Sequence, residues 1–362
     1  MDSLKSLPAI GIHAVGAYLP DNVRDNDWWS SEIVEEWRHR RRDRSGAPAG
    51  APDFTDGMRR ALTALAEIQE DPFLGMRRRH VAAPGETSID LEMAAVEDAL
   101  ARCGVDRAEI DLLLVNSSLP EDLNAPNGCL LHHRLGLAER CFTMSTAAAC
   151  NAFLMHLSIA EQMIRAGQAR YALLVYSALT SPILDPRMPL SCIFGDGAAA
   201  VVVGPVSAGR GLLGRAHRTD GRYHDVLKIG APGRPWWQAG STVMYAEDGA
   251  AGFDMLLRIP DSARQVVHEA LAQAGSAPGD VDFYASHQGT AWLRRVSQEH
   301  IGLTAARSFD TFSCAGNLGP VNIPLVLANA LREDLLHDGN LVSMYSGGSG
   351  ITWSGVVLRW GT

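Results

Sequence analysis

The sequence lacks a paired-cysteine motif, a long apolar run and an excess of basic residues. Its six cysteines include no C-x-x-C pair, which argues against a zinc site and against a thioredoxin-like redox motif. No stretch approaches the roughly 20 apolar residues of a membrane span, and the first residues do not have the pattern of a signal peptide. We therefore expect a metal-free protein of a reducing, cytoplasmic compartment, with no membrane partner.

The charge balance is acidic, with 41 Asp and Glu against 32 Lys and Arg and a net charge of -9. Phosphate backbones are bound by basic faces, so nucleic acid is not expected as a partner. Hydrophobic residues make up 46% of the 362 positions and charged residues 20%, as in ordinary globular proteins. This length accommodates two ordinary domains or one duplicated domain.

An internal repeat favours the duplicated arrangement. Residues 95–116 and 266–287 share an apolar-periodic helix, a Gly-containing turn, a polar stretch and a short strand. Residues 132–150 and 298–317 form a second matching pair of segments, each with a strand that leads into a turn of small residues. Such a repeat predicts a pseudo-two-fold α/β fold, in which each half holds a mostly parallel sheet covered by helices.

We place the N-terminal half at residues 1–205 and the C-terminal half at 206–362. A variable insertion at about 21–73 interrupts the first half, with two predicted helices and a flexible connection between them. Arginines are concentrated at residues 38–44. They form either a solvated helix face or a docking patch for an acidic carrier protein or a nucleotide phosphate.

Cys150 lies where a predicted strand turns into a predicted helix. The strand ends near Ser145, three alanines precede Cys150, and apolar residues then recur at helical spacing from Phe153. A helix N-terminus favours a thiolate, which makes the sulfur more nucleophilic, and the alanines leave room for a substrate. The alternative is a buried structural cysteine, the usual fate of Cys in an apolar segment.

Three further candidates lie at corresponding turns. His287 ends the strand at 282–286, where sites collect in sheets of this kind, although it can also be an ordinary hydrogen-bonded residue. Asn317 occupies the position opposite Cys150 in the repeat. Its amide either supports a turn or stabilises a carbonyl oxygen as negative charge develops. The glycine-rich loop 346–350 allows backbone N–H groups to approach a ligand.

In combination these motifs resemble β-ketoacyl-acyl-carrier-protein synthase III and its relatives in the thiolase superfamily. The matching segments occur in the family's order along the chain, from residue 76 to the C-terminus, and 12–24 matches its first strand. They are MRRRHVAAPGETSIDL, AAACNAF, FGDGAAAVV, the His-Gln pair at 287–288, Gly-Asn at 316–317 and GGSGITWSGVVLRW.

The resemblance implies a thiolase fold, with two βαβαβ halves in five αβαβα layers, assembled as a homodimer. Cys150 attacks a thioester delivered on an acyl carrier protein or coenzyme A. The backbone N–H groups of Cys150 and of the 347–350 loop, at Ser349 and Gly348, form the oxyanion hole. His287 and Asn317 then stabilise the enolate formed by decarboxylation of a malonyl-type extender. No metal or redox cofactor takes part.

The sequence departs from the family pattern in three places. EDPFLG at 70–75 replaces a Trp and Arg that clasp the adenine of coenzyme A, and Trp292 replaces an arginine that binds the same cofactor. Ala125 stands where short-chain synthases have a bulky Phe, which implies a wider pocket for a longer or bulkier acyl chain. We also expect Gln288 and Phe194 in this pocket.

These features favour a ketosynthase of polyketide or other secondary metabolism, with substrates supplied on carrier proteins. The main alternative is transfer of the acyl group from Cys150 to an alcohol or amine of a natural product, with His287 as general base. A non-catalytic partner subunit is a third interpretation, against which the presence of Cys150, His287 and Asn317 argues.

Overall fold

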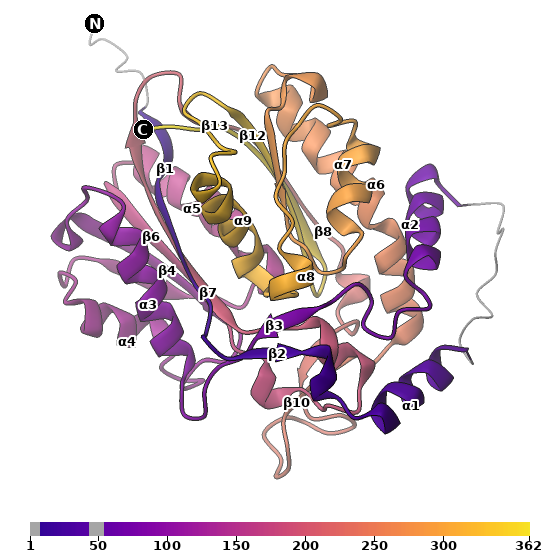
Figure 1. Cartoon of the computed structure of the whole chain (residues 1–362). Helices are drawn as coiled ribbons and strands as arrows, with labels where there is room; N and C mark the ends of the chain where they lie inside the picture. The colour runs from indigo at the N-terminus through magenta and orange to yellow at the C-terminus, as the bar shows by residue number, and fades with distance from the viewer. Residues whose placement is uncertain (1–7, 43–53) are drawn as a thin grey trace, which may run out of the picture.

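The computed structural model describes residues 8–42 and 54–362, and its core contains two central β-sheets (Figure 1). The first sheet has the strand order β1-β7-β6-β4-β5. Its strands all lie in the first half of the chain: β1 Ala9–Tyr18, β4 Ile110–Ser117, β5 Phe142–Ser145, β6 Tyr171–Ala178 and β7 Gly197–Val206.

The second sheet has the order β11-β12-β13-β8 and comes from the second half. Its strands are β8 Gly211–Thr219, β11 Phe283–Ser286, β12 Leu341–Gly348 and β13 Thr352–Arg359. Two small two-stranded sheets complete the described strands: β2 Val23–Asp25 with β3 Arg78–His80, and β9 Lys228–Gly230 with β10 Val243–Tyr245.

Helices cover both outer faces of the two sheets and fill the space between them, which gives the five expected αβαβα layers (Figure 1). The outer helices on the first sheet are α3 Ser88–Ala101 and α4 Asn127–Leu135. The central layer contains α5 Ala152–Arg165 and α9 Asn322–Arg332. The second sheet is covered by α6 Gly249–Gln273 and α7 Leu293–Ile301, and the short α8 Phe312–Ala315 precedes α9.

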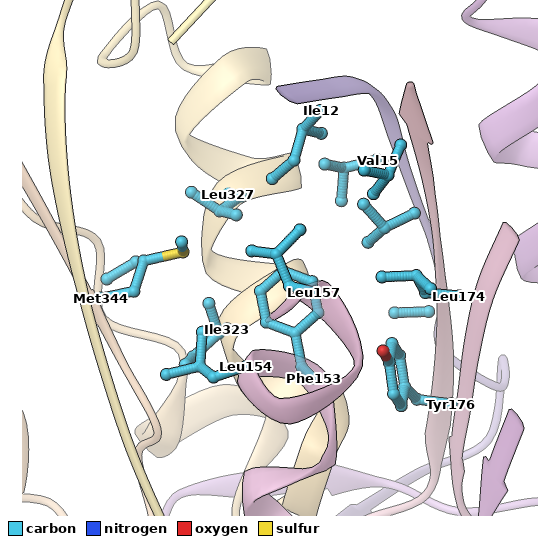
Figure 2. Packing of buried hydrophobic residues seen from close by; sticks show 14 of the residues in the cluster. Ile12, Val15, Phe153, Leu154, Leu157, Leu174, Tyr176, Ile323, Leu327 and Met344 are labelled. Atoms are coloured by element: carbon cyan, nitrogen blue, oxygen red, sulfur yellow. The ribbon is translucent and has the colours of Figure 1, made fainter. Parts of the chain in front are cut away.

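The two central helices are buried on nearly all sides because each contacts both halves of the molecule. Phe153, Leu154 and Leu157 of α5 interdigitate with Ile323 and Leu327 of α9 between the two sheets (Figure 2). These five side chains are at most 3% exposed. Burial of this kind contributes about 2 kcal/mol per large apolar side chain, so the central layer is held firmly. Helix α5 of this layer begins two residues after Cys150.

The sheets are mixed rather than mostly parallel, which corrects the expectation from the repeat. In the first sheet β4 pairs in parallel with β5 and β6, whereas β7 runs antiparallel to β6 and β1. In the second sheet only β11 and β12 are parallel. β12 and β13 run antiparallel because a short turn joins them, whereas parallel neighbours need a longer crossover connection.

The insertion forms the two predicted helices, α1 Ser31–Arg42 and α2 Asp56–Glu67. The predicted connection between them falls largely at residues 43–53, outside the described residues. Trp29 and Trp37 near α1 are buried against Phe73. The Trp37 indole also donates to the Arg187 carbonyl at 2.9 Å. The insertion is therefore anchored in the body of the protein by an aromatic cluster.

The arginine run of α1 is described only in part. Arg38 is exposed and pairs with Glu35 of the same helix at 3.2 Å. The side chains of the arginines beyond position 39 lie outside the described residues. The structure thus leaves both interpretations of the run as predictions.

Candidate active site

Cys150 lies in a tight elbow between β5 and α5. Between Ser145 and Ala152 the chain makes one 3-10 turn, and Ala149 adopts φ = 48°, in the left-handed region that non-glycine residues seldom occupy. Hydrogen bonds from the second half hold the elbow: Ser346 Oγ donates to the Cys150 carbonyl at 2.8 Å, and the Asn151 amide donates to two hydroxyls of β13. The elbow is thus a junction of the two halves.

The thiol of Cys150 is protonated in this state, contrary to the expected thiolate. Burial raises its pKa to about 11, and this outweighs the opposing effect of the backbone N–H groups of Cys150 and Ser349, which lie near the sulfur. An apolar environment disfavours the charged form more strongly than the helix N-terminus favours it. The same two N–H groups are those expected in the oxyanion hole, a role that stays a prediction.

Gly348 and Gly319 contact this elbow without side chains. A methyl group on Gly348 would lie 2.9 Å from the Asn151 nitrogen, too close for a real contact, and one on Gly319 would lie 3.9 Å from the Cys150 sulfur. Gly348, expected in the oxyanion hole, is therefore needed to let the β12 end approach the elbow. Gly319 leaves the sulfur open on its other side.

The side-chain nitrogens His287 Nε2 and Asn317 Nδ2 both lie close to Gly289. A methyl group on Gly289 would lie 2.9 Å from His287 Nε2 and 3.5 Å from Asn317 Nδ2. The Asn317 Oδ1 accepts from the Gly319 N–H at 2.9 Å, so the amide nitrogen is the end that points at the open space. Two donors that lie this close to one position can together bind a single oxygen atom.

The imidazole of His287 is neutral at physiological pH. Burial lowers its pKa to about 4, and this outweighs hydrogen bonds with the Gly319 backbone and the Asn322 side chain, which raise the pKa. Its Nδ1 is buried and has no hydrogen-bond partner in the described part of the chain. A neutral imidazole donates from one nitrogen only. The convergence with Asn317 indicates that the donor is Nε2.

A cavity of about 250 Å³ opens at the Cys150 sulfur. Its lining comes from both halves and from the β9–β10 hairpin: Asn116, Ser117, Ser118, Ala147, Ala149, Cys150, Ala178, Thr180, Phe194, Leu227, Lys228, Ile229, Met244, Gly319, Pro320 and Ser349. Phe194 lines the cavity as expected. Ala125 does not, because it is exposed in the loop before α4.

Three comparisons with known proteins agree with this geometry. Residues 144–221 match the family described as 3-oxoacyl-[acyl-carrier-protein] synthase III, and 271–360 match the C-terminal part of the same synthase. Over 308 residues the chain is 32% identical to the β-ketoacyl-[acyl-carrier-protein] synthase III of Rhodospirillum centenum, which covers 83% of this chain and 93% of that protein. The chain belongs to the β-ketoacyl-acyl-carrier-protein synthase III family.

Solved structures show the same relationship. FabH, the synthase III of Pseudomonas aeruginosa PAO1, superposes with a TM-score of 0.77 at 26% identity, over 98% of this chain and 99% of its own. OleA of Xanthomonas campestris shares the fold, with a TM-score of 0.74 at 20% identity over 98% and 99% of the two chains. The protein is accordingly an acyltransferase with the thiolase fold.

Synthases of this family need no cofactor beyond their acyl-carrier-protein or coenzyme A substrates. Within residues 8–42 and 54–362, no cluster of three or more His, Cys, Asp or Glu side chains could hold a metal ion. No helix of the same ranges is long and apolar enough to cross a membrane.

The expected pocket role of Gln288 is wrong. Its amide nitrogen donates to the Phe309 carbonyl at 2.8 Å, and its oxygen accepts from the backbone N–H groups of Thr311 and Phe312. With 1% exposure it faces the interior and does not line the cavity. Gln288 therefore ties the His287 strand to the segment that leads to Asn317. Adjacency to His287 in sequence does not reveal that orientation.

The two positions that the family uses to clasp coenzyme A are structural in this synthase. Trp292 is 2% exposed and packs among the apolar side chains between α6 and α7, so its ring cannot stack on a ligand. Phe73, in the segment that replaces the clasp, packs on Trp29 and Trp37. Both aromatic side chains are thus engaged in packing at the positions where the sequence predicts the loss of the clasp.

A buried carboxyl that was not predicted from the sequence lies behind the cavity wall. Glu92 of α3 is fully buried and accepts hydrogen bonds from Ser117 Oγ at 2.5 Å, Ser177 Oγ at 2.6 Å and Asn127 Nδ2 at 2.8 Å. Burial raises the pKa of Glu92 to about 7, although these three hydrogen bonds oppose the shift. A Glu on the otherwise apolar face of the helix at 88–101 was the available signal.

The opposite shifts of His287 and Glu92 predict opposite pH dependences of stability. The His287 pKa falls from 6.5 to about 4 on folding. The contribution of neutral His287 to the free energy of unfolding is therefore lost as the pH drops from 6.5 towards 4. The His287→Gln variant should therefore lose about 2 kcal/mol less stability than the wild type between pH 7 and 5. Urea unfolding at the two pH values measures this difference.

The Glu92→Gln variant provides the control with the opposite sign. The Glu92 pKa rises from 4.5 to about 7 on folding. The contribution of protonated Glu92 to the free energy of unfolding is therefore present at low pH and is lost as the pH rises through 7. Glu92→Gln should therefore lose more stability than the wild type on acidification. Equal pH slopes in all three proteins would contradict both assignments.

Proposed function

We propose that this synthase catalyses decarboxylative Claisen condensation through an acyl-Cys150 intermediate. The Cys150 sulfur attacks the donor thioester, its proton leaves with the donor thiol, and the sulfur–acyl bond forms. The malonyl-type extender then loses carbon dioxide, and the electron pair of the broken bond becomes an enolate. The enolate carbon attacks the acyl-cysteine, a carbon–carbon bond forms, and Cys150 is released.

The convergence of His287 Nε2 and Asn317 Nδ2 carries this proposal. Decarboxylation places negative charge on the thioester oxygen of the extender, and two donors aimed at one position stabilise that charge. Neither group needs to accept a proton. A neutral imidazole with a pKa of about 4 suits a donor better than a general base, which works best with a pKa near the operating pH.

A single-turnover chase of the acylated enzyme tests the proposal against acyl transfer to oxygen or nitrogen. Acyl-Cys150 is formed first, and then malonyl-acyl-carrier-protein or a panel of alcohols and amines is added. We expect loss of the acyl group only with the malonyl thioester, together with carbon dioxide and a β-ketoacyl product. Deacylation by an alcohol or amine, with none by the malonyl thioester, would establish the alternative function.

The departures from the family pattern support a role in polyketide or other secondary metabolism. Buried Trp292 and the aromatic cluster around Phe73 leave no coenzyme A clasp at those positions. A donor presented on a carrier protein needs only its phosphopantetheine arm in the site, so the loss of the clasp removes nothing that such a donor uses. We therefore propose acyl carrier proteins, rather than free coenzyme A thioesters, as the usual donors.

We further propose that the protein is a homodimer joined through β5. This strand is the edge of the first sheet, and Phe142 on it is 52% exposed. Unpaired edge strands are templates for pairing with another chain. Helix α4 packs on β5, so the exposed Ala125 just before α4 lies beside this edge. From there Ala125 can line an acyl pocket only across the dimer interface.

The Phe142→Glu variant should be monomeric in light scattering after size exclusion, whereas the wild type should have twice the chain mass. The exposed site tolerates the charge in the single chain, but the charge would face its symmetry mate in an edge-to-edge dimer. Leu331→Glu, at an exposed position of α9 that is 39% accessible, serves as the matched control. A monomeric wild type, or a dimeric Phe142→Glu, would exclude this interface.

A further inference from the structure

Asn116, at the end of β4, presents a polar group to the cavity where an apolar acyl chain needs none. The residue is 3% exposed and lines the cavity together with Ala149 and Cys150. Its Oδ1 accepts from the backbone N–H of Ala148 at 2.9 Å and from the Thr146 hydroxyl at 3.5 Å. These contacts fix which end of the amide is oxygen. The nitrogen is therefore the end left for the cavity.

The amide nitrogen of Asn116 makes no hydrogen bond to another described residue, although the amide oxygen accepts two. The residue lines the cavity, and its nitrogen is not among the side-chain atoms that are shut off from it. A ligand that fills the cavity displaces water from this donor, and a donor then left without a partner costs about 1–3 kcal/mol. A ligand atom that accepts this hydrogen bond avoids that cost.

Three other hydroxyl groups of the cavity lining donate their protons to protein atoms. Ser117 Oγ donates to Glu92 at 2.5 Å, Ser118 Oγ to the Ser177 carbonyl at 3.0 Å, and Thr180 Oγ1 to the Gly195 carbonyl at 3.2 Å. Each of these hydroxyls still has acceptor capacity. The cavity thus offers the Asn116 amide as a donor and several hydroxyl groups as acceptors.

We propose that the acyl group carried by Cys150 is hydroxylated near its thioester end, an inference that rests on the proposed function. A hydroxyl group can accept from Asn116 Nδ2 and donate its own proton to a cavity hydroxyl such as Ser117 or Ser118. A saturated acyl chain makes neither contact. A keto group makes only the first.

The position of Asn116 sets where along the chain the hydroxyl lies. The Asn116 amide oxygen accepts from Ala148, two residues before Cys150, and Asn116 lines the same cavity as Cys150, so we place the hydroxyl near the thioester end of the acyl group. The amide is also held in place, because Thr146 is itself bonded to His156 Nε2 at 2.8 Å. A site that hydrogen-bonds a substrate hydroxyl discriminates strongly against the analogue that lacks it.

Acylation rates with matched thioesters test the inference. Octanoyl-N-acetylcysteamine is compared with the analogues that carry a hydroxyl at C3, C4 or C5, and acylation of Cys150 is followed by intact-protein mass spectrometry. We expect at least one hydroxyoctanoyl thioester to acylate the wild type tenfold or more faster than octanoyl. The Asn116→Asp variant keeps the acceptor for Ala148 but lacks the donor, so this preference should fall to about twofold or less.

The control is Asn22→Asp, which makes the same change at an exposed position outside the cavity and should leave the preference unchanged. Faster acylation of the wild type by octanoyl than by every hydroxyoctanoyl thioester would overturn the inference, whether or not Asn116→Asp folds. So would a preference that survives in Asn116→Asp. Absence of acylation by all four thioesters and by carrier-bound donors would instead remove the proposed function, and this inference with it.

Discussion

The Cys150→Ala variant is expected to form no acyl-enzyme with any thioester donor, a loss of at least 1,000-fold in acylation rate. The sulfur of Cys150 lies near its own backbone N–H group and that of Ser349, and Cys150 lines the cavity. Alanine leaves the elbow hydrogen bonds of residues 150 and 151 intact, so only the nucleophile is removed. Intact-protein mass spectrometry after incubation with acyl-carrier-protein thioesters measures the result.

Cys129→Ala is the matched control, because Cys129 is exposed and is the residue most open to non-specific acylation. This variant should acquire one acyl group at the wild-type rate. Equal mass gain on Cys150→Ala and the wild type would eliminate the acyl-enzyme mechanism. It would also bring the non-catalytic partner subunit back as the main interpretation.

Because the pKa of Cys150 is high, acylation cannot rely on a thiol that is already ionised; the thiol must lose its proton during the attack. With a pKa of about 11, roughly one molecule in 10,000 is ionised at pH 7. Acylation then requires that the proton leave as the sulfur attacks, so we expect the acylation rate to rise steadily with pH from 7 to 9, without a plateau near 8.5.

Much of the site geometry could be predicted from the sequence because turns at the ends of strands carry their own signals. Small residues around Cys150, the strand before His287 and the glycines around Asn317 locate three turns, and the repeat pairs two of them. The structure brings these turns together: a methyl group on Gly289 would lie close to His287 and Asn317, and one on Gly319 would lie 3.9 Å from the Cys150 sulfur. Local pattern and duplication were sufficient for that step.

The electrostatics of the site could not be predicted in the same way. The helix N-terminus at Cys150 suggests a lowered pKa, but burial raises it, and burial is a sum over contacts from both halves of the chain. Gln288 illustrates the same limit, because its partners at 309–312 are more than 20 residues away. A residue's neighbours in sequence do not determine which way its side chain turns.

The role of the insertion was also inaccessible from sequence alone. Its two helices could be predicted from periodicity, but whether they formed a lid, a docking face or a dimer extension could not. The aromatic contacts of Trp29 and Trp37 show that α1 packs into the same cluster as Phe194 and Met244 of the cavity wall. The insertion therefore supports the wall of the cavity beside Cys150 from behind.

Gly289→Ala is expected to abolish condensation while leaving acylation of Cys150 nearly unchanged. The added methyl group would lie 2.9 Å from His287 Nε2 and 3.5 Å from Asn317 Nδ2, so it would occupy the position at which the two donors converge. The backbone at Gly289 is not in the left-handed region, so alanine introduces no strain of that kind. Loss of one oxyanion donor typically costs about 100- to 1,000-fold, and this change blocks two.

The measurement is a comparison of two rates, acylation of Cys150 and release of carbon dioxide from a malonyl thioester. Gly279→Ala is the matched control, since no atom lies within 4 Å of the methyl group it adds. In Gly289→Ala, acylation should stay within about threefold of the wild type, while decarboxylation falls at least 100-fold. If the two rates fell together, the methyl group would be disturbing the elbow as a whole. If neither fell, the enolate oxygen would have to bind elsewhere, and His287 and Asn317 would lose their proposed role.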